Sequence, residues 1–427
     1  MTIPKGTLAV TLFLLFPLII WLILQLTSSP ISSLFSIFFL AKTLGVLGLT
    51  SFTLALLLAV RIPLQERIFG DLGTSYRAHQ LIGTGALIAL LLHMILLFWS
   101  YAQFSLTSAF SLITPTGDTA KILGILGLSL MAICIFITYY VRLPYHIWKT
   151  THKFLSLAFL LGTLHGIFIQ GDIQTMPLLK GVFFIFLILG IGVIFYRVLF
   201  HRIFVRRTPY VVSAIKTINE KFVDVTLAPK EKGIAVKPGQ FAYVTYKNTH
   251  IKPEEHPFTI AGSSSNGTLR FITKLLGDFT NTLPCLAVGD EALIEGPYGS
   301  FSFLEGSKTQ LWIAGGIGIT PFLTFADHLP ADYKATLFYS IRDNTENAIT
   351  DDIKRLSKEK PNLTVIIWNN KENEFLTAAT ALANLNPLTT DIFLCGSGPM
   401  IKSLRTQFDT LNVPHHHIHQ EKFSLKP

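Results

Sequence analysis

The sequence predicts a multi-domain membrane protein: a bundle of six transmembrane helices, an antiparallel β-barrel, and an α/β domain. Half of the 427 residues are hydrophobic and the mean hydropathy is +0.49, too apolar for a soluble protein of this size. The apolar excess lies in the first 200 residues. Short strand-like runs follow from about residue 209, and strand–loop–helix units from about residue 308. The predicted domains are 1–204, 205–307 and 308–427.

Each of six apolar segments in the first half is long enough to cross the hydrocarbon core of a bilayer. They cover residues 7–28, 34–60, 78–100, 120–141, 151–171 and 178–200. The first resembles a signal peptide, but its apolar run is too long and it lacks a small-x-small cleavage site, so we interpret it as a span. We recognise no internal repeat among the six segments.

Positive charge gathers in alternate loops of this half. By the positive-inside rule, we expect both termini to be cytoplasmic. We expect a multi-pass protein of the cell (plasma) membrane. The net charge of +9 is concentrated at this boundary. It predicts that the protein contacts the headgroups of membrane lipids and does not bind nucleic acid. The basic residues of these loops are Arg61, Arg67, Arg77, Arg142, Lys149, Lys153, Arg197, Arg202, Arg206 and Arg207.

Four histidines stand in the third and fifth segments. His79 and His93 are fourteen residues apart, and His152 and His165 are thirteen apart. Neutral imidazole ligates iron, and burying it in lipid is costly without a partner. Fourteen helical residues rise about 21 Å and return the side chain to within about 40° of its first face. We therefore expect two bis-His haems, His79 with His152 on the inner side and His93 with His165 on the outer side.

The alternative, histidines that cap helix ends at the interface, suits His79 or His152 singly but not the other two, which lie deep in apolar sequence. Thirteen residues turn a side chain by about 140°, so the second pair does not share one face of a straight helix. We expect either an irregular helix that deforms at Gly162 or ligands that approach from different sides. Inner-haem propionates would meet Arg77, Arg142, Lys149 and Lys153, although the positive-inside pattern alone also accounts for these residues.

Glycines follow two predicted strands of the α/β domain, in "AGGIGITPF" and "CGSGPM". They let the backbone approach a pyrophosphate, whose charge a helix N-terminus stabilises, and ligands of such sheets bind beyond the C-terminal strand ends. Ordinary tight turns are the alternative. Cys395 would lie near the nicotinamide, or is simply a buried thiol. The candidate residues are Gly315, Gly316, Gly318, Thr320, Pro321, Cys395, Gly396, Gly398 and Pro399.

Two barrel segments suit a flavin and its diphosphate, although each also occurs as a common turn. "HPFTI" offers a threonine hydroxyl beside a histidine, and "LLGDFTNTL" places a glycine and a threonine at a predicted helix start. Arg342 follows the second strand of the α/β domain, where a cation favours the 2′-phosphate of NADPH, with NADH use left open. The flavin candidates are His256, Pro257, Phe258, Thr259, Gly277 and Thr280.

Together with "YHIWKTTH" (145–152) and "EGPYGSF" (295–301), these motifs resemble the ferric reductase and NADPH oxidase superfamily over nearly the whole chain. The resemblance implies a flavocytochrome with two b-type haems, FAD and NADPH, and a soluble half like ferredoxin–NADP reductase. It implies that Phe423 stacks on the isoalloxazine, with four residues after it. Lys42 matches a basic residue near the outer haem, where it would attract an anion or pair with a propionate. Alternatively, it snorkels to the interface.

The resemblance implies electron transfer from NADPH to FAD, then to the inner haem, the outer haem and an acceptor outside. Oxygen giving superoxide is the leading acceptor, and the enzyme is an NAD(P)H oxidase or ferric reductase. The alternatives are ferric chelates and a partner protein or quinone. Leu97 replaces a second histidine of animal oxidases, which weakens the case for a dedicated oxygen site. Short outer loops indicate no obligatory protein partner, and the absence of a calcium-binding loop predicts constitutive activity.

Two further features carry weaker signals. "HHHIH" (415–419) could bind a metal, but no spaced partner ligands accompany it, and it resembles the last strand of the sheet. Cys134, Cys285 and Cys395 stand in three different segments and predict no disulfide framework.

Overall fold

The computed structural model describes residues 5–28, 30, 34, 36–60, 65, 68–69, 72–114, 117–170, 175–196, 207–342 and 347–421. The chain forms two compact units, residues 1–205 and 206–426. Some residues singled out from the sequence lie outside the described residues, namely Arg61, Arg67, Arg197, Arg202, Arg206 and Phe423.

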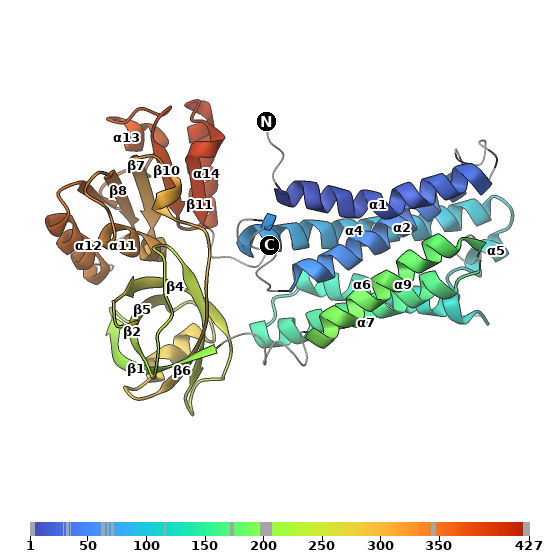
Figure 1. Ribbon diagram of the computed structural model, residues 1–427, viewed down its shortest axis with the longest axis horizontal. Coiled ribbons are helices and arrows are strands. Elements are labelled where there is room, and N and C mark those ends of the chain that lie inside the picture. Colours follow the sequence, from blue (N-terminus) through green and yellow to red (C-terminus); the bar gives the residue numbers. More distant parts are fainter. Residues whose placement is uncertain are drawn as a thin grey trace. The chain divides into compact units, whose positions relative to one another are not determined.

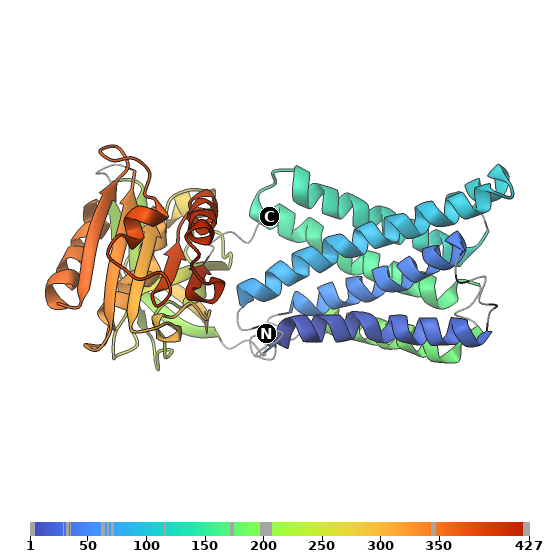
Figure 2. The ribbon, with the colours of Figure 1, turned by 90° about the horizontal axis from the view of Figure 1, so that it is seen from above.

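Long helices build the first unit (Figures 1 and 2). They are α1 (Lys5–Ser28), α2 (Ile37–Leu58), α4 (Leu72–Ala102), α6 (Thr119–Tyr140), α7 (Tyr145–Phe168) and α9 (Pro177–Phe195), with the short α5 (Leu106–Phe110) after α4. Within the described residues, five of them are long and apolar enough to span a membrane, which supports five of the six predicted spans. The exception is α7, whose first three turns include Lys149, His152 and Lys153.

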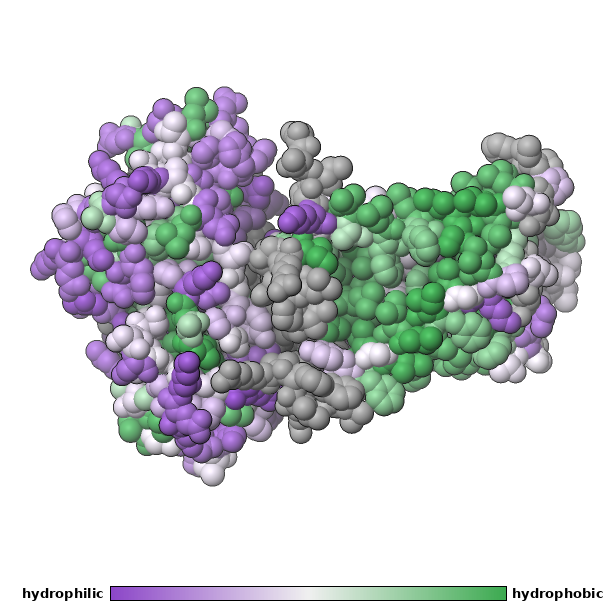
Figure 3. Space-filling model, viewed as in Figure 1, coloured by the Kyte–Doolittle hydropathy of each residue, from purple (hydrophilic) through white to green (hydrophobic). Residues whose placement is uncertain are grey.

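The outer surface of this bundle is apolar, as the continuous green area over the helices in Figure 3 shows. Phe16 on α1 and Ile188 on α9 are 61% and 67% exposed. An exposed apolar surface of this extent is the surface of a protein that lies in lipid.

Glycines let neighbouring helices approach closely inside the bundle. A Cβ added at Gly48 on α2 would lie 2.6 Å from Leu90 on α4, and one at Gly127 on α6 would lie 3.0 Å from the backbone nitrogen of Gly162 on α7. Because α7 is one continuous helix from Tyr145 to Phe168, the structure favours, of the two alternatives, ligands that approach from different sides over a helix that is irregular at Gly162. Gly162 is instead where α7 packs against α6.

The second unit begins with a closed antiparallel barrel in the order β1-β2-β5-β4-β3-β6. Its strands are β1 (Arg207–Ile218), β2 (Phe222–Pro229), β3 (Phe241–Lys247), β4 (His256–Ser263), β5 (Leu269–Lys274) and β6 (Glu291–Tyr298). The sequence indicated five of these strands, through the runs PYVVSAIKTI, FVDVTLAP, GQFAYVTY, LRFITKLL and DEALIEGP. The sixth is β4, which contains the "HPFTI" motif. Tyr210, Val225, Phe271 and Ile294 fill the barrel interior, as alternate residues of each strand point inward.

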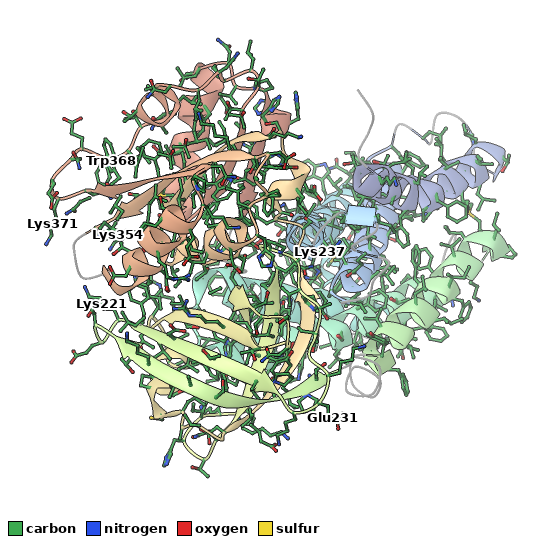
Figure 4. The ribbon with its side chains drawn as sticks, turned by 60° about the vertical axis from the view of Figure 1, so that its left-hand side comes forward. Lys221, Glu231, Lys237, Lys354, Trp368 and Lys371 are labelled. Carbon is green, nitrogen blue, oxygen red and sulfur yellow. The ribbon has the colours of Figure 1, made fainter. Side chains whose placement is uncertain are left out.

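A five-stranded parallel sheet in the order β11-β10-β7-β8-β9 completes this unit. Its strands are β7 (Thr309–Gly315), β8 (Lys334–Ile341), β9 (Leu363–Asn369), β10 (Asp391–Cys395) and β11 (Ile418–Glu421), and its helices are α11 (Thr320–Asp327), α12 (Asn347–Glu359), α13 (Ala378–Leu382) and α14 (Gly398–Thr410). Trp312 at the centre of β7 is fully buried. Figure 4 shows labelled lysines on the outside of the unit, including Lys354 on α12 and Lys371 beyond β9.

Arg270 on β5 ties the barrel to the α/β domain. It donates to Asp224 on β2 (Nη2–Oδ2, 2.6 Å) and to Asp352 on α12 (Nη2–Oδ2, 2.7 Å). Burial acts to lower the pKa of Arg270, but the hydrogen bonds and charges of the two carboxylates outweigh it, so the pKa is raised and the side chain stays charged.

Replacing this arginine should destabilise the second unit. In Arg270→Met both carboxylates lose their cation, and since the three side chains are only partly exposed we expect a loss of about 1–3 kcal/mol, measured as a lower thermal unfolding midpoint of the full chain. The control is Arg355→Met, which removes an exposed pair with Glu359 on α12 and should cost less than about 0.5 kcal/mol. Equal losses in the two variants would contradict the linking role.

Candidate functional site

Three of the four membrane histidines bond to the backbone of a neighbouring helix through Nδ1. A carbonyl oxygen only accepts, so the proton of each ring is on Nδ1 and the lone pair is on Nε2. Histidines that ligate metals have their second nitrogen fixed in this way. The pairs are His79 with Ala55, His93 with Ala41, and His165 with Ala120, at N···O distances of 2.7, 2.7 and 2.8 Å.

The fourth histidine has a different partner. His152 Nδ1 lies 3.4 Å from the hydroxyl of Thr138 on α6, and that hydroxyl donates to the carbonyl of Cys134 at 2.8 Å. The indole of Trp148, one turn earlier on α7, stacks on the His152 ring at 5.2 Å. Both histidines of α7 therefore face α6, as those of α4 face α2.

The separation of the His79 and His152 rings suits metal ligation. The centroids of His79 and His152 are 6.1 Å apart. A metal–imidazole bond is about 2 Å long and a ring centroid lies about 1 Å behind its nitrogen, so two rings on one iron have centroids about 6 Å apart. His93 and His165 have the same fixed Nδ1 proton, through the carbonyls of Ala41 and Ala120. The ring geometry of His79 and His152 fits one bis-His haem, and the tautomers of His93 and His165 are those that the ligands of a second one need.

The backbone of a glycine lies against each of the rings of His93 and His165. A Cβ added at Gly45 on α2 would lie 2.9 Å from His93 Nδ1, and one at Gly124 on α6 would lie 2.7 Å from His165 Nδ1. Any larger residue would push the ring away. Each glycine comes four residues after the alanine whose carbonyl accepts from that ring.

Lys42 follows Ala41 on α2, and its Nζ lies 4.2 Å from the centre of the Phe38 ring. At the opposite end of the bundle, Arg77 on α4 is exposed and donates to Thr74 at 2.6 Å. Lys149 is partly buried and Lys153 is exposed in the first turns of α7, and Arg142 just precedes that helix. Their predicted contact with propionates stays a prediction.

The flavin candidates lie on β4 and the loop after β5. His256 bonds Glu254 through Nε2 at 3.1 Å, and its ring stacks on Phe279 with centroids 3.8 Å apart. Pro257, Phe258 and the buried Thr259 follow along β4. The Thr280 hydroxyl accepts the backbone N–H groups of Leu276 and Gly277, both at 2.9 Å. The helix that begins at Thr280 is a 3-10 helix, Thr280–Cys285.

The two glycine loops meet at the end of the sheet. After β7, residues Gly316–Ile319 form a 3-10 turn, and α11 follows with Thr320 and Pro321 in its first turn. A Cβ at Gly318 would lie 2.3 Å from the Cys395 carbonyl oxygen at the end of β10. The strand order reverses between β7 and β10, and open α/β sheets bind their ligands at such a switch point.

Six candidates border this end of the sheet. A Cβ at Gly315 or Gly396 would meet Met400, at 2.5 and 2.7 Å, so the two loops pack together beneath that side chain. Gly398 and Pro399 begin α14. Arg342 is exposed directly after β8, and Gly316 has a φ of +54°.

Cys395 itself is fully buried. Burial raises the pKa of the Cys395 thiol well above its ordinary value, and the neighbouring charge of Glu421 adds to the effect. The group is therefore a neutral thiol at physiological pH. These observations favour the reading of an ordinary buried thiol over that of a reactive group beside the nicotinamide.

Three protein families match successive parts of the chain. Residues 44–163 match the ferric reductase like transmembrane component, residues 209–302 an FAD-binding domain, and residues 312–406 the oxidoreductase NAD-binding domain. The chain has the architecture of the ferric reductase and NADPH oxidase superfamily. The three matches follow the order of that architecture: a transmembrane component, an FAD-binding domain that falls on the barrel, and an NAD-binding domain that falls on the parallel sheet.

The soluble half of this ferric reductase-like chain is also similar to single proteins. It is 27% identical over 236 residues to the reductase component of propane 2-monooxygenase from Rhodococcus jostii, and 28% identical over 232 residues to the anthranilate 1,2-dioxygenase electron transfer component from Acinetobacter baylyi. Each match covers 50% of this chain and 62% or 66% of the relative, so the chain spans less than two thirds of their length.

Among solved structures, flavohemoglobin from Malassezia yamatoensis, with bound FAD and heme, is similar in fold. The identity is 18% and the TM-score 0.52, over 90% of this chain and 96% of that one. At this identity the likeness concerns the fold alone.

The ferric reductase-like unit contains an internal repeat that was not predicted. Residues 41–49 read AKTLGVLGL and residues 120–128 read AKILGILGL. An offset of 79 residues maps Ala41 onto Ala120 and Gly45 onto Gly124, so the repeat supplies the carbonyl and the glycine seat of each outer histidine. The shared pattern A-K-x-L-G-x-L-G-L was the signal that could have identified these residues.

The histidine-rich segment has a structural role. His415–His417 form a 3-10 turn before β11, so the predicted strand starts later, at Ile418. His417 Nδ1 and His419 Nε2 lie 3.2 and 2.7 Å from the buried carboxylate of Asp391, which also accepts the Ser307 N–H at 2.7 Å. Within the described residues, no group of three or more His, Cys, Asp or Glu is arranged to hold a metal.

Asp391 should contribute stability in a pH-dependent way. Burial acts to raise the pKa of Asp391, but the hydrogen bonds from Ser307 and His419, together with the neighbouring His417, outweigh it, so the pKa is lowered. The contribution is then complete above the unfolded pKa of about 3.9 and is lost as the pH falls through the lower folded pKa. We expect Asp391→Asn to lose about 1–3 kcal/mol at pH 7, and less below about pH 4.

The measurement is the thermal unfolding midpoint at several pH values. Asp409→Asn is the control, because Asp409 faces only the exposed His415, at 3.5 Å, and its loss should have little effect. A loss in Asp391→Asn that stayed constant down to pH 3 would contradict the linkage.

Proposed function

We propose that this protein lies in the plasma membrane with both termini in the cytoplasm and carries electrons from cytosolic NADPH, through FAD and two bis-His haems, to molecular oxygen on the outer side, giving superoxide. The observation that supports this proposal most directly is the set of four histidines on α4 and α7. Three of them are fixed through Nδ1 by backbone carbonyls, and the rings of His79 and His152 lie 6.1 Å apart.

Within this proposal the histidine pairs position the haems and leave them no open ligand site. When bound, haem supplies one-electron chemistry, which the two-electron donor NADPH cannot provide directly. His79 and His152 would hold the inner haem, and His93 and His165 the outer one. Held by two imidazoles each, the haems would supply electron transfer and not oxygen binding, and oxygen would receive single electrons from the outer one.

The soluble half supplies the electrons. The paired glycine loops after β7 and β10 bring backbone N–H groups and the start of α11 to the switch point of the sheet, where a pyrophosphate would bind. Arg342 after β8 would meet the 2′-phosphate, which is the reason for proposing NADPH, with NADH as a second donor. His256, Thr259 and Thr280 lie on the barrel segments that would hold the flavin.

Two electron acceptors other than oxygen have specific support. Lys42 directly follows the Ala41 carbonyl that accepts from His93, so its charge would lie near the outer haem and attract an anion. That anion could be a ferric chelate, and Leu97 in place of a second histidine leaves this alternative open. Donation to a partner protein is the other alternative, supported by relatives named as reductase or electron transfer components.

The test is NADPH consumption by the purified, haem- and FAD-loaded protein in detergent, with cytochrome c as reporter, with and without superoxide dismutase. Loss of the cytochrome c signal with dismutase is the expected result for oxygen as the immediate acceptor. A signal that persists, together with faster anaerobic turnover on ferric chelates, would replace oxygen by iron. A signal that persists without any response to ferric chelates would favour a protein acceptor.

A further inference from the structure

The two inner histidines are held by unlike groups, although the helices that hold them are related by the repeat. The offset of 79 residues maps Ala55 onto Cys134. The Ala55 carbonyl accepts directly from His79, at 2.7 Å. The corresponding Cys134 carbonyl accepts instead from the Thr138 hydroxyl, at 2.8 Å, and this hydroxyl stands between the carbonyl and His152.

The spacing of the α7 histidines accounts for this difference. His152 and His165 are thirteen residues apart, one fewer than His79 and His93. One residue turns a side chain by about 100° around a helix, so with His165 seated at Ala120 the His152 ring is turned away from the direction that fourteen residues would give. The Thr138 hydroxyl reaches from α6 toward the turned His152 ring and takes the place of the backbone carbonyl as its neighbour.

We propose that Thr138 is a positioning residue that sets the redox potential of the inner haem through His152, an inference that rests on the proposed function. Because its proton is given to the Cys134 carbonyl, the hydroxyl oxygen faces His152 Nδ1 with a lone pair. This contact, at 3.4 Å, is weaker than the carbonyl bonds of 2.7–2.8 Å on the other three rings.

An acceptor at Nδ1 makes an imidazole a stronger electron donor to a metal and thereby stabilises the ferric state. The Trp148 ring, stacked on His152, helps to keep Nδ1 directed at the hydroxyl. Removing the hydroxyl should therefore weaken the ferric state of the iron bound by His152 and raise its potential. The outer haem, whose ligands bond Ala41 and Ala120, should be unaffected.

The experiment is a redox titration, followed by haem absorption, of the full-length haem- and FAD-loaded protein with Thr138→Val or Thr138→Ala, and with Thr138→Ser as the conservative variant. We expect the first two to raise one of the two midpoint potentials, by up to a tenfold change in the ferric/ferrous ratio or about 59 mV, and serine to restore it. The electron paramagnetic resonance signal of one low-spin ferric centre should change with it.

The matched control is Thr84→Val on α4, whose hydroxyl bonds Gln80 and Tyr139 and neither His79 nor His93. Unchanged potentials in the folded valine and alanine variants would overturn the inference, as would a shift that serine fails to restore or a shift of both haems. A different result would refute the proposed function itself. This result is a wild-type protein without haem or without flavin-dependent reduction, and it would be seen before any variant is made.

Discussion

Replacing His93 with alanine should abolish electron transfer to an acceptor outside while NADPH still reduces the flavin. His93 is proposed as a ligand of the outer haem, and His165 alone cannot hold a six-coordinate iron there. The glycine backbone at Gly45 beside the removed ring offers no replacement ligand. We expect cytochrome c or oxygen reduction to fall more than roughly a hundredfold.

Two measurements separate this result from general damage. Haem content should fall from two per chain to one, and stopped-flow flavin reduction by NADPH should keep its wild-type rate. The control is Ile95→Ala on the same helix, a lipid-facing position that is 58% exposed. Slow flavin reduction in a folded His93→Ala protein would contradict the order of electron transfer.

A methyl group at Gly318 should disable the nucleotide site. In Gly318→Ala the new Cβ would lie 2.3 Å from the Cys395 carbonyl oxygen and 2.7 Å from the Gly396 nitrogen, both backbone atoms that cannot rotate away. The loops after β7 and β10 must separate, and the start of α11 moves with them. A displacement of about 1 Å at a reacting site costs roughly a hundredfold in rate, so we expect flavin reduction by NADPH to fall by that order.

The measurement is the dependence of flavin reduction on NADPH concentration, with FAD content as the check on the barrel. Gly262→Ala on β4 is the matched control, because its Cβ would meet only the Arg270 side chain, at 3.4 Å. If Gly318→Ala bound and oxidised NADPH like the control, the two loops would not form the nucleotide site.

Patterns confined to one segment predicted the fold well. Apolar length indicated the helices, and the alternation of apolar residues indicated five barrel strands and the parallel sheet. The strand β4 was not recognised, since its "HPFTI" sequence was interpreted as a ligand motif. The sequence did indicate which residues end β7 and β10, and the structure brings those two loops together.

The parts that could not be predicted depend on contacts between segments. The carbonyl partners of the histidines are backbone atoms, which have no side-chain signature. Gly162 illustrates the same limit: its sequence permitted a bend, but its contact with Gly127 makes it a packing residue. The role of His417 and His419 depends on Asp391, which lies on a different strand.

The repeated helix pairs have a consequence for how the protein is made. One pair, α2 with α4, carries His79 and His93, and the other, α6 with α7, carries His152 and His165. With the proposed pairing, each pair provides half of both iron sites and neither can retain a haem alone. Haem capture would then report that both halves have been inserted and have joined, so that a truncated or misinserted chain lacks haem absorption and passes no electrons across the membrane.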